Sequence, residues 1–311
     1  MKAWVFDKYG EADVLYLDDI NKPEPKDNEI LIRICSTTVA AADWRMRKAE
    51  PFVMRLMNGL TRPKKIRVLG FELAGEVESV GKDIKRFKKG DYVFAFSGLR
   101  FGTHSEYICL PEKGSTRSGL VEKMPEGSTF SSASAIPAGG LTSIYFLKEK
   151  GNISKGKRVL VYGASGSVGT FSVQIAKYYG AEVTAVCSSK NVELVKSLGA
   201  DHIIDYTKEN YSHSQKEYDI IFDAVGKTSK SEAKKVLAKG GLYLSSKQIA
   251  TFSMENLGLL KQLYENSDIK TVVDREYSFE EIPEAHRYVE GFHKVGNVVV
   301  KVEQKTCQEP S

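Results

Sequence analysis

A glycine-rich run at residues 159–169, VLVYGASGSVG, contains residue types whose spacing suits phosphate binding. Gly163, Gly166 and Gly169 follow an apolar segment at intervals of three, and Ala164 stands at the first glycine of the pattern G-x-G-x-x-G. Gly166 lets the backbone approach a phosphate, Gly169 lets helix and strand pack closely, and a helix start adds a positive dipole end. We predict a dinucleotide site in this turn, with a purely structural turn as the alternative.

The residues after the next predicted strand, 182–187, bear on which dinucleotide binds. Twenty-one residues after Gly166 stands Cys187, where an NAD site would have an Asp or Glu for the ribose. Ser188, Ser189 and Lys190 follow, and two hydroxyls with a cation suit the 2′-phosphate of NADP. Alternatively, Ser189 or Asn191 merely caps the next helix. The two roles are compatible, and the pattern favours NADP(H).

The strands and helices that position these phosphate-binding residues follow different patterns in two parts of the chain. Residues 1–115 hold short β-rich segments, and from about residue 130 strands alternate with helices, which indicates an α/β fold with a doubly wound parallel sheet. Strands are predicted at 3–6, 29–35, 73–80, 91–96, 106–110, 159–162, 182–187, 202–205, 219–224, 242–245 and 296–302. Helices are predicted at 140–150, 168–179, 192–198, 231–238 and 251–263, with Gly199 and Gly240 each ending one.

The composition is ordinary for a globular protein of two domains: 311 residues, 41% hydrophobic and 27% charged. The apolar runs are too short for a membrane span, and the N-terminus does not read as a signal peptide. The four cysteines, at 35, 109, 187 and 307, form no C-x-x-C pair. We therefore expect no disulfide and a reducing, cytoplasmic location.

A basic run at residues 45–67 carries much of the net charge of +5. It predicts a solvated loop that lends a positive field near an anionic cofactor. RNA binding is a weaker alternative because no RNA-binding motif accompanies the run. We expect neither a nucleic-acid nor a membrane partner.

Several segments resemble one family along nearly the whole chain, the medium-chain dehydrogenase/reductase superfamily in its zinc-independent quinone oxidoreductase-like branch. They are VLGFELAGEVESVG (68–81), FKKGDYVFAF (87–96), AIPAGGLTSIYF (135–146), LVKSLGADHIIDY (194–206) and AHRYVEGFHKVGNVVVKV (285–302). The resemblance implies a GroES-like β-barrel catalytic domain at 1–121 and 268–311, and a Rossmann NADP-binding domain at 122–267. It also implies a homodimer formed through the edge of the cofactor-domain sheet.

Zinc ligands are missing from the matching positions. Where the zinc-dependent branch has Cys, His and Cys, this chain has Ala40, Phe71 and Ala138, none of which can bind a metal. Asp43 and Glu72, which lie near the metal in that branch, remain, but two carboxylates alone are poor zinc ligands. The structural-zinc cysteine loop is absent, and the five histidines show no ligand spacing. We predict no metal site and structural roles for these side chains.

Without a metal, hydride transfer from NADPH to a conjugated acceptor is the easier chemistry. A quinone or an α,β-unsaturated carbonyl spreads the negative charge, and the protein mainly orients the reactants. By resemblance, the acceptor lies between the domains near residues 40–45, Phe71 and residues 138–142. Thr142 matches a position that touches the nicotinamide. Arg45 is a candidate oxyanion partner, with a surface arginine as the alternative, and the proton donor stays unnamed.

The predicted cofactor contacts follow the glycine turn and the resemblance. Ser165, Gly166, Ser167 and Val168 should cradle the pyrophosphate, and Ser188, Ser189 and Lys190 should hold the 2′-phosphate. By resemblance, Tyr206 lies beside the adenosine phosphate, Ala224, Val225 and Gly226 line the ribose and nicotinamide, and Asn297 reaches the cofactor from the catalytic domain. Each of these residues could instead have a purely structural role. That alternative is strongest for Tyr206, which could be a packed residue at the end of a strand.

Two questions stay open at the level of sequence. The segment at 245–251 is shorter than in most family members. Either this protein has a short connection there, or the segment lacks a loop that would form a mobile lid near the acceptor. The alternatives to a quinone or enone reductase are a zinc-independent reductase of another ketone or acyl substrate, and a nonenzymatic NADPH-binding or redox-sensing protein.

Overall fold

The computed structural model of the chain describes residues 1–302 and Cys307. It divides into two compact units. The first contains Met1–Pro137, Ser253–Lys261 and the described residues from Val273 onward, and the second contains Ala138–Phe252 and Gln262–Val272. The domain boundaries predicted above stay a prediction. No helix among the described residues is both long and apolar enough to cross a membrane.

A seven-stranded sheet forms the core of the first unit. Its order is β13-β14-β3-β4-β5-β7, and β6 pairs with β3. The strands are β3 (Glu29–Val39), β4 (Glu72–Val80), β5 (Tyr92–Phe96), β6 (Tyr107–Pro111), β7 (Leu120–Lys123), β13 (Val273–Ser278) and β14 (Asn297–Lys301). β1 (Lys2–Val5) and β2 (Tyr16–Asp19) pair separately. The predicted strands are confirmed, and β3 runs beyond residue 35 because the β-branched Thr37 and Thr38 also suit a strand.

Three strands of this sheet meet at one edge. β14 is antiparallel to β3, and β3 is antiparallel to β4, so the start of β14, the end of β3 and the start of β4 coincide. Asn297, Ala40 and Glu72 occupy these three places. The predicted tail strand therefore does rejoin the N-terminal strands.

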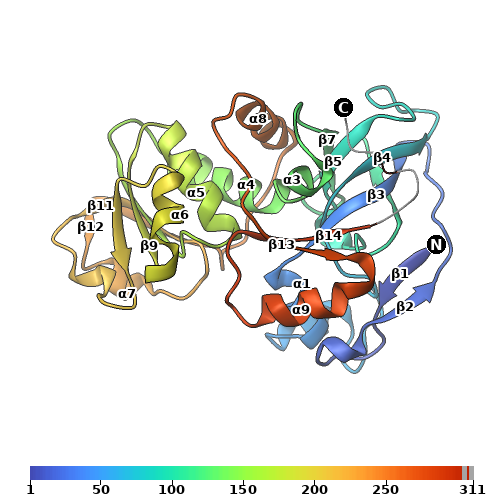
Figure 1. Cartoon of the computed structure of the whole chain (residues 1–311), viewed down its shortest axis with the longest axis horizontal. Helices are drawn as coiled ribbons and strands as arrows, with labels where there is room; N and C mark the ends of the chain where they lie inside the picture. Colours follow the sequence, from blue (N-terminus) through green and yellow to red (C-terminus); the bar gives the residue numbers. More distant parts are fainter. Residues whose placement is uncertain (303–306, 308–311) are drawn as a thin grey trace. The chain divides into compact units, whose positions relative to one another are not determined.

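Helices α1 (Ala41–Lys48) and α9 (Ile282–Glu290) lie side by side although they come from opposite parts of the chain (Figure 1). Arg47 in α1 is fully buried and donates to the carboxylate of Glu290, which also pairs with Lys48. This shared carboxylate joins the two helices. The unit also contains α2 (Val53–Asn58) and α3 (Phe130–Ser134).

The second unit is built on a five-stranded parallel sheet of order β10-β9-β8-β11-β12. Its strands are β8 (Arg158–Tyr162), β9 (Glu182–Cys187), β10 (His202–Asp205), β11 (Tyr218–Asp223) and β12 (Leu237–Ser245). From β8 the chain adds two strands on one side and then two on the other. This order is the doubly wound arrangement that the alternation predicted, with its switch point between β8 and β11.

The helices of this unit follow the prediction with two differences. They are α4 (Pro137–Ile144), a π-helical turn (Tyr145–Lys150), α5 (Ser167–Tyr178), α6 (Val192–Ser197) and α7 (Lys230–Ala233), and α8 (Met254–Glu265) begins in the first unit. Gly199 follows the end of α6 with φ 98°, as predicted. The helix predicted at 231–238 ends at Ala233, and Gly240 does not end a helix. It lies inside β12 with φ 80°, where the pairing with β11 shifts register.

The expectation that the chain has no disulfide is wrong. Cys35 in β3 is bonded to Cys307, with 5.8 Å between their Cα atoms. Their sequence separation of 272 hid the pair, because β14 pairs with β3 only in the folded chain. The amide of Val302, the residue after β14, donates to the carbonyl of Cys35 at 2.9 Å. Cys109 and Cys187 are free.

Residues 246–253 alone join β12 to α8. A turn starts the connection, with the amide of Gln248 donating to the carbonyl of Ser245 at 2.9 Å. Ile249 in this connection is 91% exposed. The connection between β12 and α8 is thus short, with an exposed side chain at Ile249.

Candidate active site

The turn after β8 has the geometry of a phosphate-binding turn. Gly163 has φ 76°, and the amides of Gly163 and Ala164 both donate to the carbonyl of Val186 at 3.0 Å. Helix α5 starts at Ser167, with Gly166 extended at its N-cap. The first amides of a helix have no partner inside the helix and carry the positive end of its dipole. The turn therefore directs donors toward an anion, as the glycine spacing predicted.

Gly169 and Gly166 are glycines for different reasons: packing requires the first, and the second leaves open space. A Cβ atom on Gly169 would lie 2.1 Å from the carbonyl oxygen of Gly163 and 2.7 Å from the Cα of Ala164. The fold itself therefore requires glycine there. A Cβ on Gly166 would meet only the oxygen of Gly163, at 3.5 Å. The space beside Gly166 is open, which fits a ligand phosphate close to the backbone.

The segment after β9 is tied to this turn. The side-chain amide of Asn191 donates to the hydroxyl oxygens of Ser165 at 2.9 Å and Ser188 at 3.3 Å. Ser188 is buried, whereas Ser189 and Lys190 are exposed. The structure thus brings together the groups predicted for the pyrophosphate and those predicted for the 2′-phosphate. Asn191 links them, and the sequence suggested only a capping role for it.

A carboxylate that the sequence reasoning missed lies beside Ser189. The hydroxyl of Ser189 donates to Asp205, and Thr207 donates to the same carboxylate through its amide at 3.0 Å and its hydroxyl at 2.7 Å. These hydrogen bonds, with Lys208 at 3.4 Å, hold the pKa of Asp205 well below its ordinary value. Asp205 faces the end of β9 because β10 pairs with it in register, Asp205 opposite Cys187.

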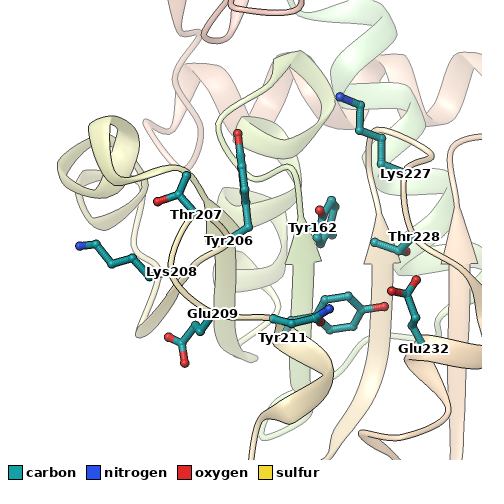
Figure 2. Close-up of a pocket in the computed structure, with 10 residues that line it drawn as sticks. Tyr162, Tyr206, Thr207, Lys208, Glu209, Tyr211, Lys227, Thr228 and Glu232 are labelled. Atoms are coloured by element: carbon teal, nitrogen blue, oxygen red, sulfur yellow. The ribbon is translucent and has the colours of Figure 1, made fainter.

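Tyrosines line a cavity of about 290 Å³ at the carboxyl ends of β8, β10 and β11 (Figure 2). The rings of Tyr162 and Tyr206 are nearly parallel, at 28°, with centroids 6.5 Å apart. Tyr211 meets Tyr162 edge-on at 5.6 Å, and Thr228 lies on the far side of the cavity. Tyr206 is 53% exposed, so it is not a packed strand end. The cavity offers aromatic faces at the edge where doubly wound sheets bind ligands.

The segment 224–226 is shaped by Asp223, which sequence reasoning also missed. This fully buried residue ends β11, and its carboxylate accepts from the amides of Val225 at 3.2 Å, Gly226 at 2.8 Å and Thr228 at 2.8 Å. The turn brings the Val225 side chain within 2.6 Å of the place where Gly163 would carry a Cβ. Ala224–Gly226 therefore lie against the glycine turn.

The remaining predicted residues lie in both units. In the second unit, Thr142 is partly exposed in α4, next to Ser143, whose hydroxyl donates to the carbonyl of Val168 at 3.0 Å. In the first unit, the Arg45 guanidinium lies 5.4 Å from the ring of Trp44. Asn297 is buried at the start of β14. Thr142 is thus held beside the glycine turn, and Asn297 beside Ala40.

Side chains without metal-binding atoms occupy the positions matched to zinc ligands. Phe71 packs edge-on against Phe96 and Phe101 at 5.7 and 5.8 Å. The carboxylate of Asp43 binds the backbone: it accepts hydrogen bonds from the amides of Ala40 and Gly70, at 2.8 Å each. Burial raises the pKa of Asp43 to about 7, against the pull of those two amides. No cluster of metal-binding side chains is found in the part of the chain that the structure describes.

Comparison with known proteins places this geometry in a family. Residues 26–126 match the model of the alcohol dehydrogenase GroES-like domain, and residues 167–282 match that of the zinc-binding dehydrogenases. A 2-methylene-furan-3-one reductase of Solanum lycopersicum is 33% identical, over 96% of this chain and 79% of its own. A chloroplastic NADPH-dependent alkenal/one oxidoreductase of Arabidopsis thaliana is 34% identical over the same shares.

The solved structure of a quinone oxidoreductase from Coxiella burnetii superimposes with a TM-score of 0.84 at 26% identity, over 97% of this chain and 99% of that one. The chain belongs to the medium-chain dehydrogenase/reductase superfamily. It falls in the quinone oxidoreductase-like branch, and it is an oxidoreductase. The predicted α/β fold, with a GroES-like part and a parallel sheet, is confirmed.

Proposed function

We propose that this protein uses NADPH to reduce quinones or α,β-unsaturated carbonyl compounds. The observation that carries the proposal is the open glycine turn joined through Asn191 to Ser188. The names of the relatives support it, since they include an alkenal/one oxidoreductase, a furanone reductase and a quinone oxidoreductase. When bound, NADPH supplies the hydride.

The chain's own residues bind the cofactor along the carboxyl edge of the parallel sheet. The open space beside Gly166 and the start of α5 suit a pyrophosphate, and the Tyr162–Tyr206 cavity suits the flat adenosine end. The proposed contacts are Ser165, Gly166, Ser167, Val168, Ser188, Ser189, Lys190, Tyr206, Ala224, Val225 and Gly226, with Thr142 and Asn297 toward the nicotinamide. Because the hydroxyl of Ser189 donates a hydrogen bond to Asp205, Ser188 and Lys190 carry most of the 2′-phosphate binding in this proposal.

The proposed reaction needs no zinc. Alanine and phenylalanine at positions 40 and 71 offer no donor atom, and Asp43 is committed to two amides. A conjugated acceptor suits such a site, since its own π-system spreads the charge that hydride transfer creates. The apolar wall of Phe71, Phe96 and Phe101 suits a flat acceptor and excludes water.

Steady-state oxidation of NADPH with a panel of quinones, enones, enals and saturated ketones tests the proposal. We expect turnover with conjugated acceptors, none with saturated ketones, and no change after dialysis against a chelator. Turnover of saturated ketones would favour the alternative reductase of ketone or acyl substrates. Tight NADPH binding without turnover of any acceptor would favour a nonenzymatic redox sensor.

We further propose a homodimer and a cytoplasmic location. Light scattering on the purified chain tests the first, and imaging of a tagged chain tests the second. The disulfide between Cys35 and Cys307 opposes a cytoplasmic location, because disulfides are rare where thiols are kept reduced. Trapping of free thiols in cell extracts would show whether the bond forms in the cell.

A further inference from the structure

Large apolar side chains are exposed in and around helix α2 of the first unit. Phe52, Val53, Leu56 and Leu60 are each between 51% and 65% exposed. Phe52 has helical backbone angles directly before α2, so it lies on the same side of the helix as Leu56, four residues later. Exposed apolar side chains grouped in this way mark a site of interaction.

Asn58 fixes the loop that follows α2. Its side chain is buried, and its oxygen accepts from the amides of Lys65 at 3.1 Å and Ile66 at 2.7 Å. Its side-chain amide donates to the carbonyl of Ile66 at 2.9 Å. The amide of Lys64 donates to the carbonyl of Asn58 at 2.7 Å. Residues 59–64 therefore form a loop that is closed at its base by backbone and side-chain bonds.

The same segment is strongly basic. Residues 51–67 include no acidic residue, and their cations are Arg55, Arg62, Lys64, Lys65 and Arg67. Arg67 pairs with Asp7 at 2.6 Å. Arg62, Lys64 and Lys65 are exposed, and the salt bridges of the described residues include none from these three side chains. Their charge is therefore available to an anionic partner.

Arg55 connects the charged and the apolar side chains. Its guanidinium lies 5.7 Å from the ring of Phe52 and 5.0 Å from the ring of Tyr9. Its Nη1 lies 3.5 Å from the carbonyl oxygen of Leu60, and the hydroxyl of Tyr9 donates to the neighbouring carbonyl of Gly59 at 2.7 Å. Phe52 and Leu60 are thus joined through one cation into a single basic–apolar surface, formed by residues 52–65.

We propose that the basic–apolar surface docks the protein on membranes that contain anionic lipids. The apolar side chains enter the boundary between headgroups and acyl chains, and the cations pair with the anionic headgroups. From the sequence we expected no membrane partner, because its apolar runs are too short to span a bilayer, but a peripheral contact needs no span. Docking involves no turnover, so it is independent of the proposed function.

Other occupants fit the basic–apolar surface less well. A second copy related by a two-fold axis would bring the same cations of both copies together, where they repel each other. Nucleic acid would pair with the cations, but only aromatic side chains stack on bases, and Phe52 is the one aromatic residue in the segment. A bilayer surface accommodates both the charges and the aliphatic side chains without a matching shape.

Co-sedimentation of the full chain with lipid vesicles tests the proposal. The vesicles contain phosphatidylcholine alone, or phosphatidylcholine with about one third phosphatidylserine. We expect binding to the anionic vesicles only. Because exposed charges are screened by salt, binding should weaken at least about 10-fold when NaCl is raised from about 0.1 M to about 0.5 M.

Substitution of two cations tests the charged part of the surface. Lys64→Glu combined with Lys65→Glu should weaken binding at least about 20-fold, since each cation close to an anionic membrane contributes about a factor of five. Lys234→Glu combined with Lys235→Glu is the matched control. Those two lysines are also adjacent and exposed, they lie in the second unit, and their substitution changes the net charge equally.

Substitution of two leucines tests the apolar part. Leu56→Ser combined with Leu60→Ser should weaken binding about 10-fold and leave its salt dependence unchanged. The control is Leu99→Ser combined with Ile249→Ser, which removes two exposed aliphatic side chains from other segments. All of these side chains are exposed, so calorimetry should show a wild-type Tm for each variant.

A tryptophan at position 52 reports insertion directly. The two native tryptophans, Trp4 and Trp44, are buried, so the emission added in Phe52→Trp comes from the surface. It should shift to shorter wavelength with anionic vesicles and be quenched by brominated lipids. Vesicles of phosphatidylcholine alone should leave it unchanged.

Four results would overturn the proposal. The first is no binding of the wild type to anionic vesicles. The second is an equal loss in both pairs of lysine variants, since attraction would then follow net charge alone. The third is binding that the leucine variant retains in full, without a spectral shift in Phe52→Trp, which would favour nucleic acid or an acidic protein as the partner. The fourth is self-association of the wild type that the leucine variant abolishes, which would make the partner a second copy.

Discussion

At the scale of single residues, the cofactor end of the site depends on a few short-range contacts after β9. Ser188, Ser189 and Lys190 follow the strand, but they are not equivalent. Ser188 is linked to Asn191, Ser189 is committed to Asp205, and the ammonium of Lys190 is exposed to solvent. Lys190 is therefore the predicted residue most able to distinguish a phosphorylated ribose from an unphosphorylated one.

Replacement of Lys190 by alanine should raise the KM for NADPH about 10-fold and leave the KM for NADH unchanged. A charge-assisted contact to a phosphate is worth about 1.5 kcal/mol, which corresponds to this factor. Initial rates with both cofactors measure it. Lys196→Ala is the control, because Lys196 pairs with Glu193 on the surface of α6. Equal losses with both cofactors would contradict a role in phosphate recognition.

At the scale of elements, the sequence predicts what depends on local pattern. The glycine run predicted the turn between β8 and α5, and the alternation of strands and helices predicted the parallel sheet. Asp205 and Asp223 were missed because their roles depend on register between strands and on turn amides. Gly240 was misread because a bulge and a helix end both use a glycine with positive φ.

The two glycines of the turn allow a matched pair of variants. Gly169→Ala should unfold or strongly destabilise the protein, since the new Cβ would lie 2.1 Å from a backbone oxygen. Gly166→Ala should keep its Tm within a few degrees, because its Cβ has ordinary contacts and its φ is −81°. Its affinity for NADPH should still fall at least 10-fold if the phosphate lies in that space. Calorimetry and fluorescence titration measure both properties.

A Gly166→Ala protein that binds NADPH as tightly as the wild type would place the phosphate elsewhere. A Gly169→Ala protein with wild-type Tm would show that helix α5 can move away from the turn. The pair is informative because both changes add the same methyl group, three residues apart, on the same turn.

At the scale of the whole molecule, the disulfide connects the end of the described chain to strand β3. A crosslink between residues so far apart restricts the unfolded chain, which stabilises a protein by about 2–5 kcal/mol. Cys307→Ser should therefore lower the Tm, and a reductant should lower the wild-type Tm toward the same value. Differential scanning calorimetry with and without reductant measures this. Cys109→Ser is the control, since Cys109 is a free thiol.

A Tm of Cys307→Ser equal to that of the oxidised wild type would mean that the bond adds nothing to stability. A wild-type Tm that does not respond to reductant, with a lower Tm for the variant, would mean that the reductant cannot reach the bond. Mass spectrometry of alkylated protein distinguishes these cases by counting the free thiols.

Stability against acid should depend on two buried histidines of the first unit. His104 and His286 are fully buried and meet edge-on at 5.4 Å. Burial lowers the pKa of His104 to about 4, and burial, aided by His104 and Arg47, lowers that of His286 well below its ordinary value. The native protein holds both neutral, whereas the unfolded chain protonates them below about pH 6.5. Proton uptake by the unfolded state therefore destabilises the fold as the pH falls below 6.5.

His286→Phe isolates this effect. The unfolded variant takes up one proton fewer, so its free energy of unfolding relative to wild type should rise by up to about 1.4 kcal/mol per pH unit below 6.5. Asp43, whose raised pKa of about 7 acts in the opposite direction between pH 4 and 7, is present in both proteins and cancels in the difference. Urea unfolding at pH 7.5, 6.0 and 5.0 measures it. A difference that does not change with pH would mean that His286 is protonated in the native protein. A buried anion or water would then accompany its nitrogens, which have no hydrogen-bond partner among the described residues.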